Sequence, residues 1–141
     1  MTPKERAENS AKAMWANDNA SSWLGMELGE VDEGRAVLTL TIEPRHANGH
    51  GICHGGITFA LADSAFAFAC NSRNQSAVAQ HNVISYIAPA KIGDRLTATA
   101  IEVSLNGRNG IYDVKVKNAK DQIIAEFRGF SRAINGQHFQ E

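Results

Sequence analysis

The chain has 141 residues, 43% of them apolar and 7% aromatic, which is enough for one folded domain with its own core. Its 14 basic and 15 acidic residues nearly cancel, which argues against a nucleic-acid binder or a polybasic membrane-surface protein. No apolar stretch approaches the ~18 residues of a membrane span, and the first eight residues are too polar for a secretory signal, so we expect a cytoplasmic protein.

Residues 1–25 predict an N-terminal helical segment. Residues 3–17 have the apolar stripe of an amphipathic helix, and a short second turn follows over residues 19–24. Residues 27–31 and 35–43 then predict a hairpin, because apolar and polar residues alternate along the second strand.

Residues 55–70 predict a helix that is buried on all sides. Only three of its side chains are polar, namely Thr58, Asp63 and Ser64, and the apolar ones point in every direction. In a chain of this length, a sheet wrapped around the helix is the simplest way to bury it.

The remainder of the chain predicts that sheet, followed by a frayed tail over residues 134–141. The order of elements indicates a single α+β domain over residues 1–141, with one antiparallel sheet packed on one long helix. An open sheet leaves edges exposed, so we expect a homo-oligomer to cover them. The predicted strands are 78–87, 95–105, 110–117 and 122–133.

Charge is nearly absent from the middle of the chain. Residues 47–90 contain two charged residues, Asp63 and Arg73, where an even distribution would place about nine. This segment is therefore built to be buried, and a carboxylate within it requires an explanation.

The start of the predicted 55–70 helix combines two features of a hydrolytic site. Gly55 and Gly56 leave backbone N–H groups open to an anion or a developing oxyanion, although the two glycines alone would favour a tight turn or close packing. Asp63 supplies a carboxylate that would attack a carbonyl or activate water. Eight residues of helix span ~12 Å, so one helix does not bring both groups to one carbonyl. Two antiparallel helices across a two-fold axis would, which predicts a composite site between subunits.

Three other chemistries remain open at this point. Four histidines and one cysteine are of the types that bind metal ions. Their segment is glycine-rich and lacks a carboxylate, so we expect no metal. A Cys53–His nucleophile pair lacks an orienting partner, and Ser64 lacks the turn typical of a serine nucleophile. The five residues are His46, His50, Cys53, His54 and His81.

Three arginines are candidates to bind a phosphorylated ligand. Arg128 and Arg132 are four residues apart on a predicted strand and therefore share a face with Phe130. Arg108 lies in a predicted turn. Each arginine alone is most simply a surface charge, but together they would receive phosphates.

The residues also carry a family resemblance. Residues 48–72, NGHGICHGGITFALADSAFAFACNS, resemble the loop and helix of the hot-dog-fold acyl-CoA thioesterases, in particular those of phenylacetic acid degradation. Residues 110–114 and 127–132 fit as well, and the similarity extends over about residues 13–136. It implies a curved antiparallel sheet around one long helix, and dimers that pair into tetramers.

The resemblance also implies roles for individual residues. Gly55 would give its N–H to the thioester carbonyl with His54 beside it, Asp63 would be the catalytic carboxylate, and Asn48 would hold the carbonyl or the attacking water. Ser64 falls where the family often has a small hydroxyl.

The substrate implied is acyl-CoA, in particular phenylacetyl-CoA and hydroxyphenylacetyl-CoA. Gly56 and Phe59 would help to shape its pocket, and the arginines would bind the CoA phosphates, although Ala88 stands where many relatives have a basic residue. No separate cofactor is expected, because coenzyme A is part of the substrate. The alternatives are a hot-dog enoyl-CoA hydratase or dehydratase, and a non-catalytic module that binds CoA ligands.

Overall fold

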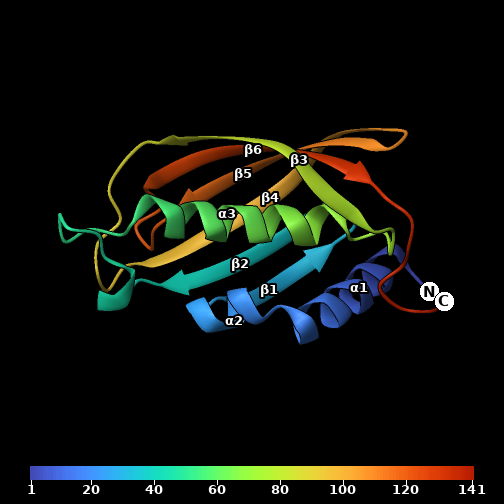
Figure 1. Ribbon diagram of the computed structural model, residues 1–141, viewed down its shortest axis with the longest axis horizontal. Helices are drawn as coiled ribbons and strands as arrows, with labels where there is room; N and C mark the ends of the chain where they lie inside the picture. Colours follow the sequence, from blue (N-terminus) through green and yellow to red (C-terminus); the bar gives the residue numbers. More distant parts are fainter.

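The computed structural model describes residues 1–141 as a six-stranded antiparallel sheet curved around one long helix (Figure 1). The strand order is β1-β2-β4-β5-β6-β3, so β1 and β3 are the two edges. The α+β prediction is therefore confirmed. The helices are α1 (Pro3–Asn17), α2 (Asn19–Leu24) and α3 (Gly55–Cys70), and a 3-10 turn spans Pro44–His46. The strands are β1 (Glu27–Asp32), β2 (Arg35–Thr41), β3 (Ala77–Tyr86), β4 (Arg95–Asn106), β5 (Asn109–Lys117) and β6 (Ile123–Ala133).

The N-terminal helices begin where their sequences provide caps. Thr2 and Glu5 form a capping box at α1, in which each side chain accepts the other residue's N–H. The Asp18 side chain accepts from Ser21 N–H at the start of α2. In Figure 1 both helices run beside the β1 edge, while β3 lies at the other edge of the sheet. No helix has the length and the apolar character needed to cross a membrane.

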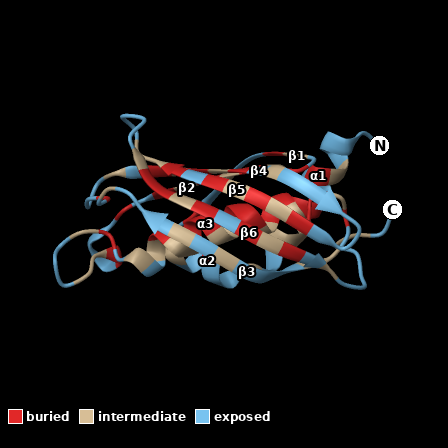
Figure 2. Cartoon of the chain, turned by 90° about the horizontal axis from the view of Figure 1, so that it is seen from above, coloured by how far each residue is buried: buried red, intermediate tan, exposed pale blue.

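The core lies between α3 and the concave face of the sheet (Figure 2). Paired residues form a buried row across four strands, from Leu38 through Ala98 and Val116 to Ala125. Two of the four are alanines, and their small side chains leave room for the helix to approach the sheet. The core contains 24 buried apolar residues, contributed by the sheet, α3 and the segments that cover them.

The expectation that α3 is buried on all sides was wrong for a single chain. Seven of its 16 residues are buried, and the remainder include a partly exposed group with Phe59, Asp63 and Cys70. The physical reason is that the sheet encloses one side of the helix, and β3, the strand nearest the open side, is an edge. This edge carries exposed Val78, Val83 and Tyr86.

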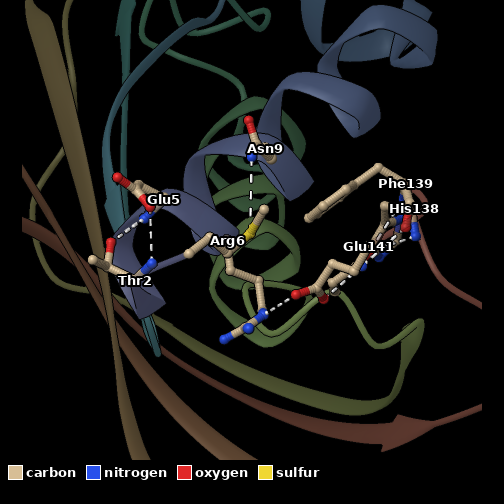
Figure 3. Close-up of polar contacts among 9 residues, drawn as sticks. Thr2, Glu5, Arg6, Asn9, His138, Phe139 and Glu141 are labelled. Atoms are coloured by element: carbon tan, nitrogen blue, oxygen red, sulfur yellow. Dashed lines mark hydrogen bonds and ion pairs between the residues drawn. The ribbon is translucent and has the colours of Figure 1, made fainter.

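The last eight residues form no helix or strand, but they are not frayed as the sequence predicted (Figure 3). Asn74 accepts the N–H groups of His138 and Phe139 through Oδ1, and its Nδ2 donates to Glu141. The Glu141 carboxylate also pairs with Arg6 of α1 at 2.9 Å. The tail is fixed because both the oxygen and the nitrogen of the Asn74 side-chain amide hydrogen-bond to it. Asn74 itself has a left-handed φ of 59°.

Candidate active site

The loop before α3 is held in place by contacts on both of its sides. The backbone N–H of His54 donates to the carbonyl of His46, and Cys53 N–H donates to Ala90. An isolated bridge also joins Ile52 to Lys91. The first turn of α3 is therefore fixed relative to the segment that follows β3.

One backbone donor at the start of α3 is free. The His54 Nδ1 accepts the Gly56 N–H at 2.8 Å, and the His54 carbonyl accepts Ile57 N–H. Gly55 N–H has no acceptor in the chain. It lies at the positive end of the helix dipole, where an oxyanion would be stabilised. Of the two glycines predicted to receive an anion, Gly55 keeps a free donor, whereas the Gly56 donor is occupied by His54.

A groove of about 450 Å³ opens beside this donor. Asn48 lines it together with Gly55, and apolar side chains form much of its wall. The Asn48 Oδ1 accepts the His50 N–H at 2.9 Å, which fixes the side chain, while its Nδ2 has no acceptor in the chain. The structure therefore brings two donors that the sequence had suggested, Gly55 N–H and Asn48 Nδ2, to one groove. The apolar lining residues are Ile52, Cys53, Ile87, Ala88, Pro89, Ala90 and Ile124.

Tyr86, at the end of β3, also lines this groove and was missed by the sequence analysis. Its hydroxyl donates to the carbonyl of Gly55 at 2.9 Å. A Cβ at position 55 would lie 3.2 Å from the Tyr86 Cζ, a tight contact from which the ring would have to shift by a few tenths of an ångström. No local pattern indicates this contact, because the two residues are 31 positions apart.

Asp63 lies two turns further along α3, on the partly exposed side of the helix. Asn82 Nδ2 donates to its Oδ1 at 3.3 Å, and no cation pairs with it. Burial raises the pKa of Asp63 above its usual value, and the Asn82 hydrogen bond opposes part of that rise. A partly buried carboxyl with a raised pKa is a candidate for proton transfer.

Gly55 and Asp63 do not act on one carbonyl within a single chain. They belong to the same helix, and eight residues of helix span ~12 Å. The distance between Gly55 and Asp63 that we expected from the sequence is therefore kept, because both residues lie in the regular helix α3.

Two other predicted site residues make structural contacts. The Ser64 hydroxyl lies 3.0 Å from the Ser21 hydroxyl, which in turn donates to Asp18, so this chain of contacts ties α3 to α2. Phe59 packs edge-on against Phe127 at 5.5 Å, and it does not line the groove at Gly55.

The three candidate arginines divide into two groups. Arg108 and Arg132 line one groove of about 580 Å³, and neither forms an ion pair within the chain. Arg128 pairs with Asp113 on the neighbouring strand at 2.6 Å. This pairing lowers the pKa of Asp113 and leaves Arg128 less available to a phosphate.

Two residues considered for the other chemistries, His46 and Cys53, make contacts within the chain. The buried His46 uses both ring nitrogens, accepting from Glu43 N–H and contacting the Leu24 carbonyl. No group of three or more histidine, cysteine and acidic side chains is arranged to hold a metal ion. Burial raises the pKa of the Cys53 thiol, which disfavours the thiolate that a nucleophile needs.

These features agree with a known family. A family model of the thioesterase superfamily matches residues 50–125. The chain belongs to this superfamily and is a thioester hydrolase, and the sheet wrapped around α3 is its hot-dog fold.

Individual relatives are similar over nearly the whole chain. The acyl-coenzyme A thioesterase PaaI of Escherichia coli (strain K12) is 43% identical over 93% of this chain and 94% of the relative. The solved structure of the E. coli PaaI protein from the phenylacetic acid degradation operon superposes with a TM-score of 0.95 at 41% identity, covering 96% of this chain and 99% of that one. Human acyl-coenzyme A thioesterase 13 is 34% identical over 83% of this chain and 86% of the relative.

Proposed function

We propose that the chain hydrolyses acyl-CoA thioesters, with the thioester carbonyl oxygen bound at the Gly55 N–H. The observation that carries this proposal is that free N–H, which opens on a groove shared with Asn48. A donor fixed before the reaction stabilises the charge that develops on the oxygen, and losing one costs about 10²–10³ in kcat. The relatives named acyl-coenzyme A thioesterases support the substrate class.

In this proposal the carboxylate comes from Asp63 of a second copy of the chain. The unpaired edge β3, its exposed apolar side chains and the half-buried side of α3 all favour a partner at this place. A two-fold axis beside β3 would make the two α3 helices antiparallel and bring the Gly55 of each towards the Asp63 of the other. We further propose that such dimers pair into a tetramer.

Attack on the thioester carbonyl gives a tetrahedral intermediate with its oxyanion at Gly55. Asp63 either accepts a proton from the attacking water or attacks the carbonyl carbon itself. Asn48 Nδ2 adds a second hydrogen bond to the carbonyl or to the water. His54 keeps the first turn of α3 in shape by accepting the Gly56 N–H. Collapse of the intermediate breaks the C–S bond and releases CoA as the thiolate. With water as the nucleophile this step also yields the carboxylic acid, whereas attack by Asp63 leaves a mixed anhydride that water then hydrolyses through a second tetrahedral intermediate.

We propose aryl-acetyl thioesters such as phenylacetyl-CoA and hydroxyphenylacetyl-CoA as substrates. The support is the relative from a phenylacetic acid degradation operon, together with the mostly apolar lining of the groove. Arg108 and Arg132, which have no ion-pair partner, are our candidates for the CoA phosphates. The reaction needs no separate cofactor. We place it in the cytoplasm, where free thiols such as Cys53 and Cys70 stay reduced.

A thiol-release assay on aromatic and aliphatic acyl-CoA thioesters tests this proposal. We expect turnover that is highest on aryl-acetyl substrates and falls by at least about 100-fold in an Asp63→Asn variant of unchanged fold and assembly. Full activity of that variant would overturn the role of Asp63. Hydration of enoyl-CoA without thiol release would instead identify a hydratase, and binding of CoA ligands without turnover would identify a binding module.

A further inference from the structure

Asn82 of β3 is the one side chain that hydrogen-bonds to the Asp63 carboxylate. Its Nδ2 donates to Asp63 Oδ1 at 3.3 Å, between residues 19 positions apart in the chain. Asn82 is paired across the sheet with Gly129 of β6, so the sheet fixes its backbone. The amide is therefore held against α3 by a rigid element.

The other end of the same amide has no partner. Asn82 Oδ1 is buried and accepts no hydrogen bond. Burial of an unpaired carbonyl oxygen costs free energy, whereas a leucine of similar shape would avoid that cost. The chain therefore keeps at this position an amide whose side chain makes one hydrogen bond, the donation to Asp63.

No charged group performs this task in place of Asn82. On α3 itself, Cys70 is the other titratable group coupled to Asp63, and burial raises the pKa of its thiol to about 12, so it stays neutral. On β3, His81 stacks on Phe130 at 5.0 Å. Asp18, which caps the start of α2, reaches this part of α3 only through the hydroxyls of Ser21 and Ser64.

We propose that Asn82 is a positioning residue for Asp63, which orients the carboxylate and favours its ionised form. The inference rests on the proposed function, in which the ionised carboxylate is the base or the nucleophile. The opposing effects on the pKa of Asp63 agree with it, because burial raises that pKa and the Asn82 hydrogen bond lowers it.

The test compares Asn82→Leu and Asn82→Asp with the parent enzyme. Leucine removes the hydrogen-bond donor, and aspartate replaces it with a like charge. The acid limb of the kcat/KM profile should therefore move to higher pH in Asn82→Leu and further still in Asn82→Asp. We expect kcat/KM of Asn82→Leu to fall about tenfold on the acid limb, as loss of a hydrogen bond to a charged group predicts. Gln80→Leu is the matched control, because it removes another β3 amide, one bonded to Asn109 and the Ser131 carbonyl.

Stability separates positioning from a structural role. A positioning role predicts that the acid limb moves whether or not the Tm of Asn82→Leu changes, because the substitution removes both the unpaired buried oxygen and the hydrogen bond to the carboxylate. A lower Tm for Asn82→Leu with an unmoved acid limb would overturn the inference. It would also be overturned if the acid limb moved by the same amount in Asn82→Leu and Gln80→Leu.

A direct titration of the Asp63 carboxyl by NMR, without substrate, separates this inference from the proposed function. If Asp63→Asn retains hydrolysis, the proposed function fails, but the titration still shows whether Asn82 lowers the pKa of Asp63. If Asp63→Asn is inactive and the titration is the same in the parent and Asn82→Leu, the function stands and the role of Asn82 is refuted.

Discussion

The Tyr86 hydroxyl donates a 2.9 Å hydrogen bond to the Gly55 carbonyl, and its ring lies where a Cβ on residue 55 would meet it at 3.2 Å. The end of the edge strand β3 thereby holds the first residue of α3, the residue whose N–H is free. The peptide geometry at the candidate oxyanion site depends on a residue of a different element.

Gly55→Ala should abolish most activity while the fold persists. The new Cβ would lie 3.2 Å from Tyr86 Cζ, so we expect the ring to shift and to weaken the hydrogen bond that holds the Gly55 peptide. We expect kcat/KM to fall about 10- to 100-fold in the thiol-release assay, with circular dichroism unchanged. The matched control is Gly49→Ala in the adjoining loop, where a Cβ would meet no atom within 4 Å. Equal losses in both variants would contradict the specific role of Gly55.

Tyr86→Phe should have a smaller effect than Gly55→Ala. It removes the hydrogen bond to the Gly55 carbonyl and retains the ring. A neutral hydrogen bond is worth about 1 kcal/mol, so we expect kcat to fall about 2- to 10-fold with little change in KM. An unchanged kcat would show that the ring alone holds Gly55.

Asp63→Asn should be more stable than the parent at neutral pH, although we expect it to lose activity. Because the folded state raises the pKa of Asp63, it binds the proton more tightly than the unfolded state does. Stability is therefore lost as the pH rises from the ordinary aspartate range through the raised pKa, and the full cost remains above it. We expect a higher Tm for Asp63→Asn at pH 7 and equal Tm values below both pKa values. Thermal unfolding at several pH values measures this, and a lower Tm at pH 7 would refute it.

Arg108→Ala and Arg132→Ala should weaken binding of CoA thioesters without slowing chemistry. Both arginines line one groove without an ion-pair partner, so each is free to bind a phosphate. We expect a severalfold rise in KM for CoA thioesters and no change for pantetheine thioesters, which lack the nucleotide. Arg128→Ala is the control, because Asp113 already neutralises Arg128. A KM that rises equally in all three variants would place the phosphates elsewhere.

Glu102→Gln should destabilise the protein in a pH-dependent way. Glu102 accepts two hydrogen bonds from Arg73 and one from Tyr112, and the Arg73 hydrogen bonds chiefly lower its pKa. Because the pKa of Glu102 is lower in the folded state than its ordinary value of 4.5, the ionised carboxylate stabilises the fold at pH values above 4.5. This stabilisation is lost as the pH falls through the pKa of the folded state. We expect a loss of about 1–2 kcal/mol at pH 7 that shrinks below pH ~4, measured by urea unfolding. A loss of the same size at all pH values would exclude the charge as its cause.

The secondary structure could be predicted from the sequence because its signals are local. The helix predicted over residues 55–70 has those bounds in the structure, and the strand predicted over 78–87 is Ala77–Tyr86. Alternation and helical periodicity depend on neighbouring residues, so they need no knowledge of what packs against them. The tail at 134–141 was misjudged for the same reason, because the contact with Asn74 that fixes it is distant in sequence.

The candidate site was partly predictable. Asn48 lies in the loop before α3 and Gly55 is the first residue of that helix, so the motif that contains both already suggested that they act at the same carbonyl. Both residues line one groove in the structure. Alternation correctly placed Arg128 and Arg132 on one face of a strand. The pairing of Arg128 with Asp113 depends on the register of β5 against β6, which that pattern does not contain.

The sequence by itself determined an α+β domain, a nearly uncharged helix with one carboxylate, and a glycine-rich start for that helix. The tertiary structure alone decided which donors remain free, that Tyr86 supports Gly55 and that Asn82 contacts Asp63. The physical reason is that a hydrogen bond requires two groups at a defined distance and angle. For residues 19 and 31 positions apart, the packing of β3 against α3 sets that geometry.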